Sequence, residues 1–121
     1  MPKRILIVDD FAPIRKQIRS FLESQTDFEV CGEAVDGIDA IEKAKALSPD
    51  LIILDFQMPR MNGMEAARVL QKTLPGAQVI LFTMYGAVLS ASDVAASGIK
   101  AVLSKTDHLN VLAGHARRLL G

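Results

Sequence analysis

Two short apolar runs, each ending in aspartate, constrain the fold of this chain most strongly. Residues 5–8 are followed by Asp9 and Asp10, and residues 51–54 are followed by Asp55. Uninterrupted β-branched and leucine residues, bounded by polar ones, are typical of strands buried on both faces of a parallel sheet. A carboxylate directly after such a strand lies at its carboxyl end, the edge where open α/β sheets bind ligands. The two runs therefore predict three carboxylates at one rim of a sheet.

The rest of the chain alternates between strand-like and helix-like patterns. Apolar runs predict strands at residues 4–8, 28–34, 51–54, 78–82 and 101–103. Apolar residues at helical spacing predict helices around residues 14–22, 36–44, 64–70, 90–97 and 108–120. The helix at 90–97 is built from alanine and serine, so it buries little and should open locally at low cost. This strict alternation indicates a parallel sheet with helices on both faces.

The composition fits one domain spanning residues 1–121. Lys plus Arg and Asp plus Glu number 14 each, so no net charge attracts nucleic acid or a membrane surface. No apolar run approaches the roughly 18 residues of a membrane span, and the start of the chain does not resemble a signal peptide. The single cysteine, Cys31, cannot form an internal disulfide. We therefore expect a cytoplasmic domain that binds neither membrane nor nucleic acid.

Three carboxylates at one rim repel one another unless a cation lies among them. A small, hard cation such as Mg²⁺ takes oxygen ligands and usually only one or two direct carboxylates. We expect Asp10 and Asp55 to bind Mg²⁺ directly, Asp9 to bind directly or through water, and the backbone carbonyl of Gln57 to add an oxygen. The alternative is that Asp9 or Asp10 only caps the first helix, for which aspartate is a favoured residue.

Two further polar residues end apolar runs at the same rim. Thr83 follows residues 79–82, and Lys105 follows residues 101–104. Taken singly, such a threonine is usually a turn residue and such a lysine is usually solvated. Together with a divalent metal, a hydroxyl and an ammonium form a binding site for a phosphoryl group. Carboxylates carry phosphoryl groups covalently, and Asp55, which stands alone on the predicted central strand, is the expected nucleophile.

These landmarks resemble the receiver domain of a two-component response regulator. The resemblance rests on Val8-Asp9-Asp10, Leu54-Asp55, the following Met58-Pro59 and Met61-Asn62-Gly63, then Thr83 and Lys105. It implies a flavodoxin-like (βα)5 fold with strand order 2-1-3-4-5. It also implies Mg²⁺-dependent phosphotransfer from the phosphohistidine of a sensor histidine kinase to Asp55, and partly self-catalysed hydrolysis. In the resemblance, Thr83 and Lys105 bind the phosphoryl group, and the surface of the fourth helix, fifth strand and fifth helix then changes partners or forms a homodimer.

The chain departs from the usual receiver pattern at a few positions. Val102 stands three residues before Lys105, where the family usually has tyrosine or phenylalanine. Met84 follows Thr83, where the family prefers a small residue, and Gln57 and Tyr85 occupy positions that tune phosphate lifetime in the family. We expect Met84 to crowd the site and slow dephosphorylation.

The sequence alone leaves other functions possible. A haloacid-dehalogenase-like phosphatase would need an Asp-x-Asp motif after the first strand, and a flavin carrier would need a phosphate loop there; this chain has neither. A pseudo-receiver without phosphotransfer is favoured only by Met84 and Val102. The domain is either a stand-alone receiver acting on a downstream protein or a receiver cut from a longer regulator. The stretch Ser104-Lys105-Thr106-Asp107 is similar to receivers that precede DNA-binding output domains, which favours the second.

Overall fold

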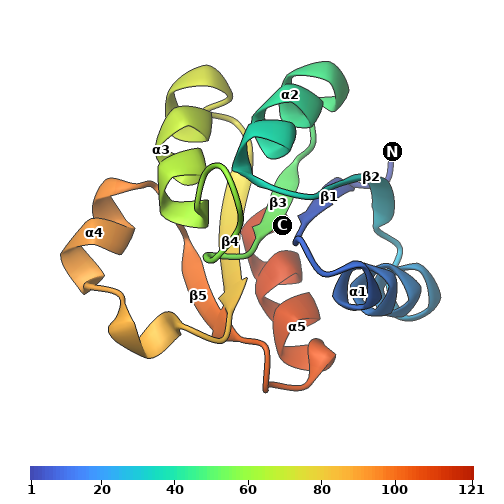
Figure 1. Ribbon diagram of the computed structural model, residues 1–121. Coiled ribbons are helices and arrows are strands. Elements are labelled where there is room, and N and C mark those ends of the chain that lie inside the picture. Colours follow the sequence, from blue (N-terminus) through green and yellow to red (C-terminus); the bar gives the residue numbers. More distant parts are fainter.

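A five-stranded parallel sheet lies at the centre of the computed structural model, which describes residues 1–121 (Figure 1). The strand order is β2-β1-β3-β4-β5, as the resemblance to receiver domains implied. The predicted fold class is therefore confirmed. The strands are β1 (Arg4–Val8), β2 (Glu29–Ala34), β3 (Leu51–Leu54), β4 (Gln78–Thr83) and β5 (Ala101–Ser104).

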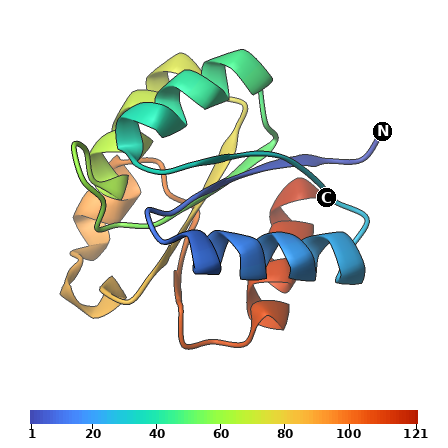
Figure 2. The same cartoon turned by 45° about the vertical axis from the view of Figure 1, so that its right-hand side comes forward.

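A helix follows each strand and covers one face of the sheet. The helices are α1 (Ala12–Gln25), α2 (Gly37–Leu47), α3 (Gly63–Thr73), α4 (Ala91–Ala96) and α5 (Leu109–Leu120). Helices α1 and α5 lie on one face, and α2, α3 and α4 lie on the other (Figure 2). None of the helices is long and apolar enough to span a membrane.

Alternate residues of the central strands divide the core into two clusters. Leu6, Ile52 and Leu81 point towards α2 and α3, whereas Ile7, Ile53 and Ile80 point towards α1 and α5. Because each strand alternates its side chains between the two faces, a strand covered on both sides must be apolar throughout. Burial on both faces therefore explains the apolar runs at residues 5–8 and 51–54.

The structure differs from the sequence-based expectation mainly between β4 and α4. A short 3₁₀ turn, η1 (Gly86–Val88), was not predicted, and β4 and β5 each extend one residue further than expected. Helix α4 is only six residues long and contains no buried residue, as its alanine and serine content predicted. Its start is fixed by Ser90, whose side chain accepts a hydrogen bond from the Asp93 amide at 3.0 Å.

Candidate functional site

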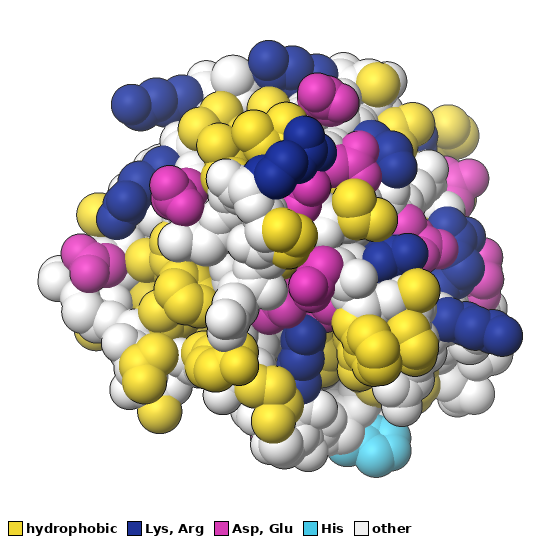
Figure 3. Space-filling model, in the orientation of Figure 1, with side chains coloured by type: hydrophobic (Ala, Val, Ile, Leu, Met, Phe, Trp, Pro, Cys, Tyr) yellow, Lys and Arg dark blue, Asp and Glu magenta, His cyan; other side chains and the backbone are white.

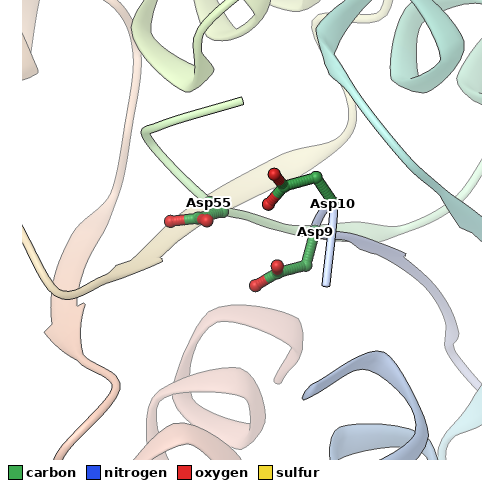
Figure 4. Close-up of side chains that lie close together, drawn as sticks. All are labelled: Asp9, Asp10 and Asp55. Atoms are coloured by element: carbon green, nitrogen blue, oxygen red, sulfur yellow. The ribbon is translucent and has the colours of Figure 1, made fainter. Parts of the chain in front are cut away.

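The pairing of β1 with β3 brings the predicted acidic residues together. Val8 pairs with Leu54, and the amide of Asp55 donates to the carbonyl of Val8 at 3.0 Å, so the strands end side by side. One oxygen from each of Asp9, Asp10 and Asp55 lies within 4.8 Å of the others. Figure 4 shows this group beyond the ends of the two strands. Asp9 and Asp55 are buried, whereas Asp10 is exposed.

Lys105 provides the positive charge at this cluster. Its Nζ lies 2.5 Å from Oδ2 of Asp9 and 3.0 Å from Oδ2 of Asp55. β5 and β3 are separated by β4 in the sheet, so the lysine side chain reaches across the end of β4. In the space-filling view, acidic side chains near the centre of the face lie next to a basic one (Figure 3).

The electrostatics of the cluster shift two ionisation equilibria. Burial raises the pKa of the Asp55 carboxyl, and the charge of Asp9 raises it further, although the hydrogen bond from Lys105 opposes both effects. Burial would lower the pKa of Lys105, but its hydrogen bonds to Asp9 and Asp55 outweigh burial and raise that pKa. The site therefore holds a charged ammonium beside a carboxylate whose ionisation is disfavoured.

The oxygen donors fit a small divalent cation. Ligands about 2.1 Å from one Mg²⁺ cannot lie more than about 4.2 Å apart. One oxygen from each of the three carboxylates lies within 4.8 Å of the others, which is close to that limit and fits a single Mg²⁺ ion. Gln57 is exposed, and no amide of the chain donates to its backbone carbonyl, which leaves that oxygen free.

Thr83 lies at the rim, but its hydroxyl makes no hydrogen bond to the acidic residues. It is buried at the end of β4, and its hydroxyl oxygen accepts a hydrogen bond from the Tyr85 amide at 3.1 Å. Its carbonyl accepts from the backbone amide of Lys105 at 3.1 Å. The sequence thus placed Thr83 correctly at the rim next to Lys105, while its hydroxyl is held by its own turn.

Neither aspartate after β1 acts as a helix cap. The N-cap of α1 is Phe11, which makes no side-chain capping bond, and Oδ1 of Asp9 accepts instead from the Phe11 amide at 2.9 Å. Arg15, which the sequence did not single out, donates from Nη1 to the carbonyl of Asp9 at 2.7 Å and from Nε to Glu33 at 2.9 Å. Its two contacts lie outside its own helix, on Asp9 after β1 and on Glu33 in β2, and no local sequence pattern indicates them.

Two of the residues that depart from the receiver pattern, Met84 and Val102, lie together beside Thr83. A hollow of about 520 Å³ is lined by Thr83, Met84, Gly86 and Val102, among others. Val102 is half-buried there, whereas Met84 is 60% exposed at the rim. Tyr85 is 46% exposed, so the only tyrosine of the chain does not fill this hollow.

Comparison with known proteins agrees with this geometry. The chain matches the response regulator receiver domain over residues 5–117, and it belongs to that family of two-component signalling domains. It is 40% identical over 121 residues to the response regulator protein VraR of Staphylococcus saprophyticus, covering 98% of this chain and 56% of that protein. It is 36% identical over 105 residues to the chemotaxis protein CheY of Thermotoga maritima, covering 87% of each.

The solved structures that resemble the chain have the same fold. The response regulator TrrA of Thermotoga maritima, in complex with Mg²⁺ and BeF, superposes with a TM-score of 0.87 at 31% identity, covering 98% of this chain and 99% of that one. CheY of Borrelia burgdorferi, in a complex with CheX, BeF3 and Mg²⁺, gives a TM-score of 0.91 at 24% identity, which supports the fold alone. The chain spans only 56% of the length of VraR, and the receiver-domain match covers residues 5–117.

Proposed function

We propose that this domain accepts a phosphoryl group on Asp55 from the phosphohistidine of a sensor histidine kinase and needs Mg²⁺ to do so. One observation carries the proposal: Asp55, Asp9 and Asp10 meet at the carboxyl ends of β1 and β3, with Lys105 in contact with two of them. A stable fold gains nothing from three crowded carboxylates, so their grouping points to a ligand.

The transfer is a single displacement at phosphorus. A carboxylate oxygen of Asp55 attacks the phosphorus atom, the N–P bond of the phosphohistidine breaks, and its electron pair returns to the imidazole nitrogen. Asp10, Asp55 and the Gln57 carbonyl would hold Mg²⁺, with Asp9 binding directly or through water, and the ion would supply charge that offsets the repulsion between an anionic nucleophile and an anionic donor. Lys105 is close enough to pair with the phosphoryl oxygens.

The same site removes the phosphoryl group. Water attacks the phosphorus of the acyl phosphate, the P–O bond to Asp55 breaks, and inorganic phosphate leaves with the carboxylate restored. The domain therefore catalyses only the turnover of its own phosphate and acts on no separate substrate. It is a signalling domain rather than an enzyme of metabolism.

Phosphorylation changes the charge that Lys105 and Thr83 face. Lys105 would exchange its contacts with Asp9 and Asp55 for the phosphoryl oxygens, and the Thr83 hydroxyl would leave the Tyr85 amide to donate to the same group. Both residues lie at the ends of the strands that precede η1 and α5. A local charge change at this point can bias the surface of α4, β5 and α5 between two arrangements.

The partners follow from this switch and from the relatives. A cytoplasmic sensor histidine kinase is the donor, and the altered surface binds a downstream protein, a fused output domain or a second copy of the chain through α4, β5 and α5. A DNA-binding regulator is one source of such an output domain, because similar structures include response regulators described as LuxR-family and DNA-binding. The domain itself contacts neither nucleic acid nor membrane.

Phosphotransfer from a kinase domain carrying labelled phosphohistidine tests the proposal. Label should move to the protein in Mg²⁺ and stay on the kinase in EDTA or with Asp55→Asn. Asp107→Asn, an exposed aspartate near the rim, is the matched control and should still accept label. Transfer that persists in Asp55→Asn would assign the phosphate to another residue.

A further inference from the structure

The loop between β3 and α3 contains one residue with a strained backbone conformation. Arg60 has φ +66°, in the left-handed region that side chains other than glycine rarely adopt. The Met61 amide donates to the Pro59 carbonyl at 2.7 Å, which closes a three-residue turn with Arg60 at its centre. A turn of this kind with positive φ is rare and strained. Ser48, the other such residue, ends a helix, where this conformation is common.

An ion pair holds this turn against the start of α2. Arg60 donates from Nε to Oδ2 of Asp36 at 2.7 Å and from Nη2 to Oδ1 at 3.1 Å. Asp36 is buried, whereas the arginine is 58% exposed, so the carboxylate is the fixed partner. Asp36 is itself anchored, because its Oδ1 accepts from the Asp39 amide at 2.8 Å as the N-cap of α2.

The backbones on either side are also in close contact. The Gly37 amide donates to the Met61 carbonyl at 3.2 Å, and a Cβ on Gly37 would lie only 2.6 Å from that oxygen. The loop is closed at its base, where the Gly63 amide donates to the Phe56 carbonyl at 2.7 Å. The free carbonyl of Gln57 lies within this closed loop, between its base and the turn at Arg60.

We propose that the Arg60–Asp36 ion pair positions the β3–α3 loop so that the Gln57 carbonyl and Asp55 are presented to Mg²⁺. This inference rests on the proposed metal site. It assigns Arg60 and Asp36 as positioning residues that act on the site from α2 and do not touch the ion. Residues that orient metal ligands from outside the ligand set commonly change metal affinity by about 10- to 100-fold.

Magnesium affinity in paired variants separates this role from a simple effect of charge. If charge alone mattered, Asp36→Asn would weaken Mg²⁺ binding because it removes a negative charge. Arg60→Ala would then strengthen Mg²⁺ binding because it removes a positive charge. The ion pair predicts that both weaken binding, by about tenfold. The double variant should be no worse than either single one, because both remove the same contact. Asparagine is also a good N-cap, so Asp36→Asn keeps α2 capped.

A glycine variant tests the strain directly. Arg60→Gly loses the ion pair but adopts the left-handed conformation without steric cost. It should therefore bind Mg²⁺ more tightly than Arg60→Ala and less tightly than the original chain. Asp27→Asn and Arg68→Ala, at exposed residues without an ion pair, serve as charge controls and should leave the affinity nearly unchanged.

Binding is measured by titrating the whole chain with MgCl₂ and monitoring NMR chemical shifts. Amide hydrogen exchange of residues 56–63 is measured in parallel, without metal. Weaker Mg²⁺ binding in both single variants, with faster loop exchange, supports the proposal. Effects of opposite sign, or lost stability with unchanged affinity, overturn it. If the original chain binds no Mg²⁺, the proposed metal site fails, and the exchange data alone still show whether the ion pair orders the loop.

Discussion

The ammonium of Lys105 lies 3.0 Å from the carboxylate of Asp55, although the two residues follow strands that are not neighbours in the sheet. The contact crosses the end of β4. Its second partner, Asp9, lies at the end of β1. One cation thus pairs with two buried carboxylates from different strands, and without the lysine both carboxylates would lose this counter-charge.

Lys105→Met should therefore destabilise the metal-free protein, because Asp9 and Asp55 would remain buried without a counter-charge. Breaking a buried ion pair typically costs about 3 kcal/mol. Urea unfolding in EDTA measures this loss, and excess Mg²⁺ should restore part of it. Lys100→Met, at an exposed lysine just before β5, is the control. Equal losses in the two variants would show that Lys105 does not stabilise the cluster.

The raised pKa of Asp55 predicts that Asp55→Asn is more stable than the original chain, by an amount that depends on pH. Burial and Asp9 disfavour the ionised carboxyl, so its pKa in the fold lies above the ordinary value of 3.8. The folded state therefore holds this proton more tightly, and stability is lost as pH rises from 3.8 through the folded pKa.

The asparagine variant does not lose this stability, because its side chain stays neutral. In EDTA at neutral pH, Asp55→Asn should unfold at a higher urea concentration than the original chain. The difference should shrink as pH falls towards 3.8. If Asp55→Asn gains the same stability at every pH, ionisation of Asp55 is not the cause of the gain.

Gly63 should tolerate no side chain, because a Cβ there would lie 2.1 Å from the carbonyl oxygen of Asp55. Gly63→Ala must shift the backbone at the end of β3 and should cost about 2–3 kcal/mol in unfolding free energy. Gly114→Ala, in the exposed part of α5 with nothing within 4 Å, should instead add about 1 kcal/mol. Thermal unfolding of the two variants should move in opposite directions, and a stable Gly63→Ala would contradict the close approach.

Met84 should slow loss of the phosphoryl group. Its side chain lines the hollow beside Thr83 and is 60% exposed. We predict that from this position it restricts the approach of water to a phosphoryl group on Asp55. Met84→Ala should shorten the phosphate half-life several-fold, measured by the decay of labelled phosphoprotein in Mg²⁺. Val88→Ala, 75% exposed on η1, is the control. An unchanged half-life in Met84→Ala would remove Met84 from the account.

Much of the site could be predicted because its residues end strands. The apolar runs before Asp9, Asp55, Thr83 and Lys105 predict the end of each strand to within one residue, and parallel strands end at one rim. The contacts of Arg15 and Arg60 could not be predicted in this way. Each joins a long, flexible side chain to a residue on another element, and such pairs depend on tertiary structure that has no local pattern.

The conformation of the turns could not be predicted from the sequence either. Nothing in residues 56–63 indicates that Arg60 rather than a glycine would adopt positive φ, because Asn62-Gly63 is the stronger turn signal. The 3₁₀ turn at Gly86–Val88 follows a strand that continues to Thr83, one residue beyond its apolar run. The length of that strand is set by pairing with β5, where Thr83 lies opposite Ser104.

The central claim is that Asp55 carries the phosphate, and the intact mass of the chain after incubation with acetyl phosphate and Mg²⁺ tests it most directly. We expect one phosphoryl adduct that disappears both in EDTA and in Asp55→Asn. An adduct that survives in Asp55→Asn would contradict it. No adduct on the original chain or on Met84→Ala would also contradict it, and would indicate a receiver fold that has lost phosphotransfer.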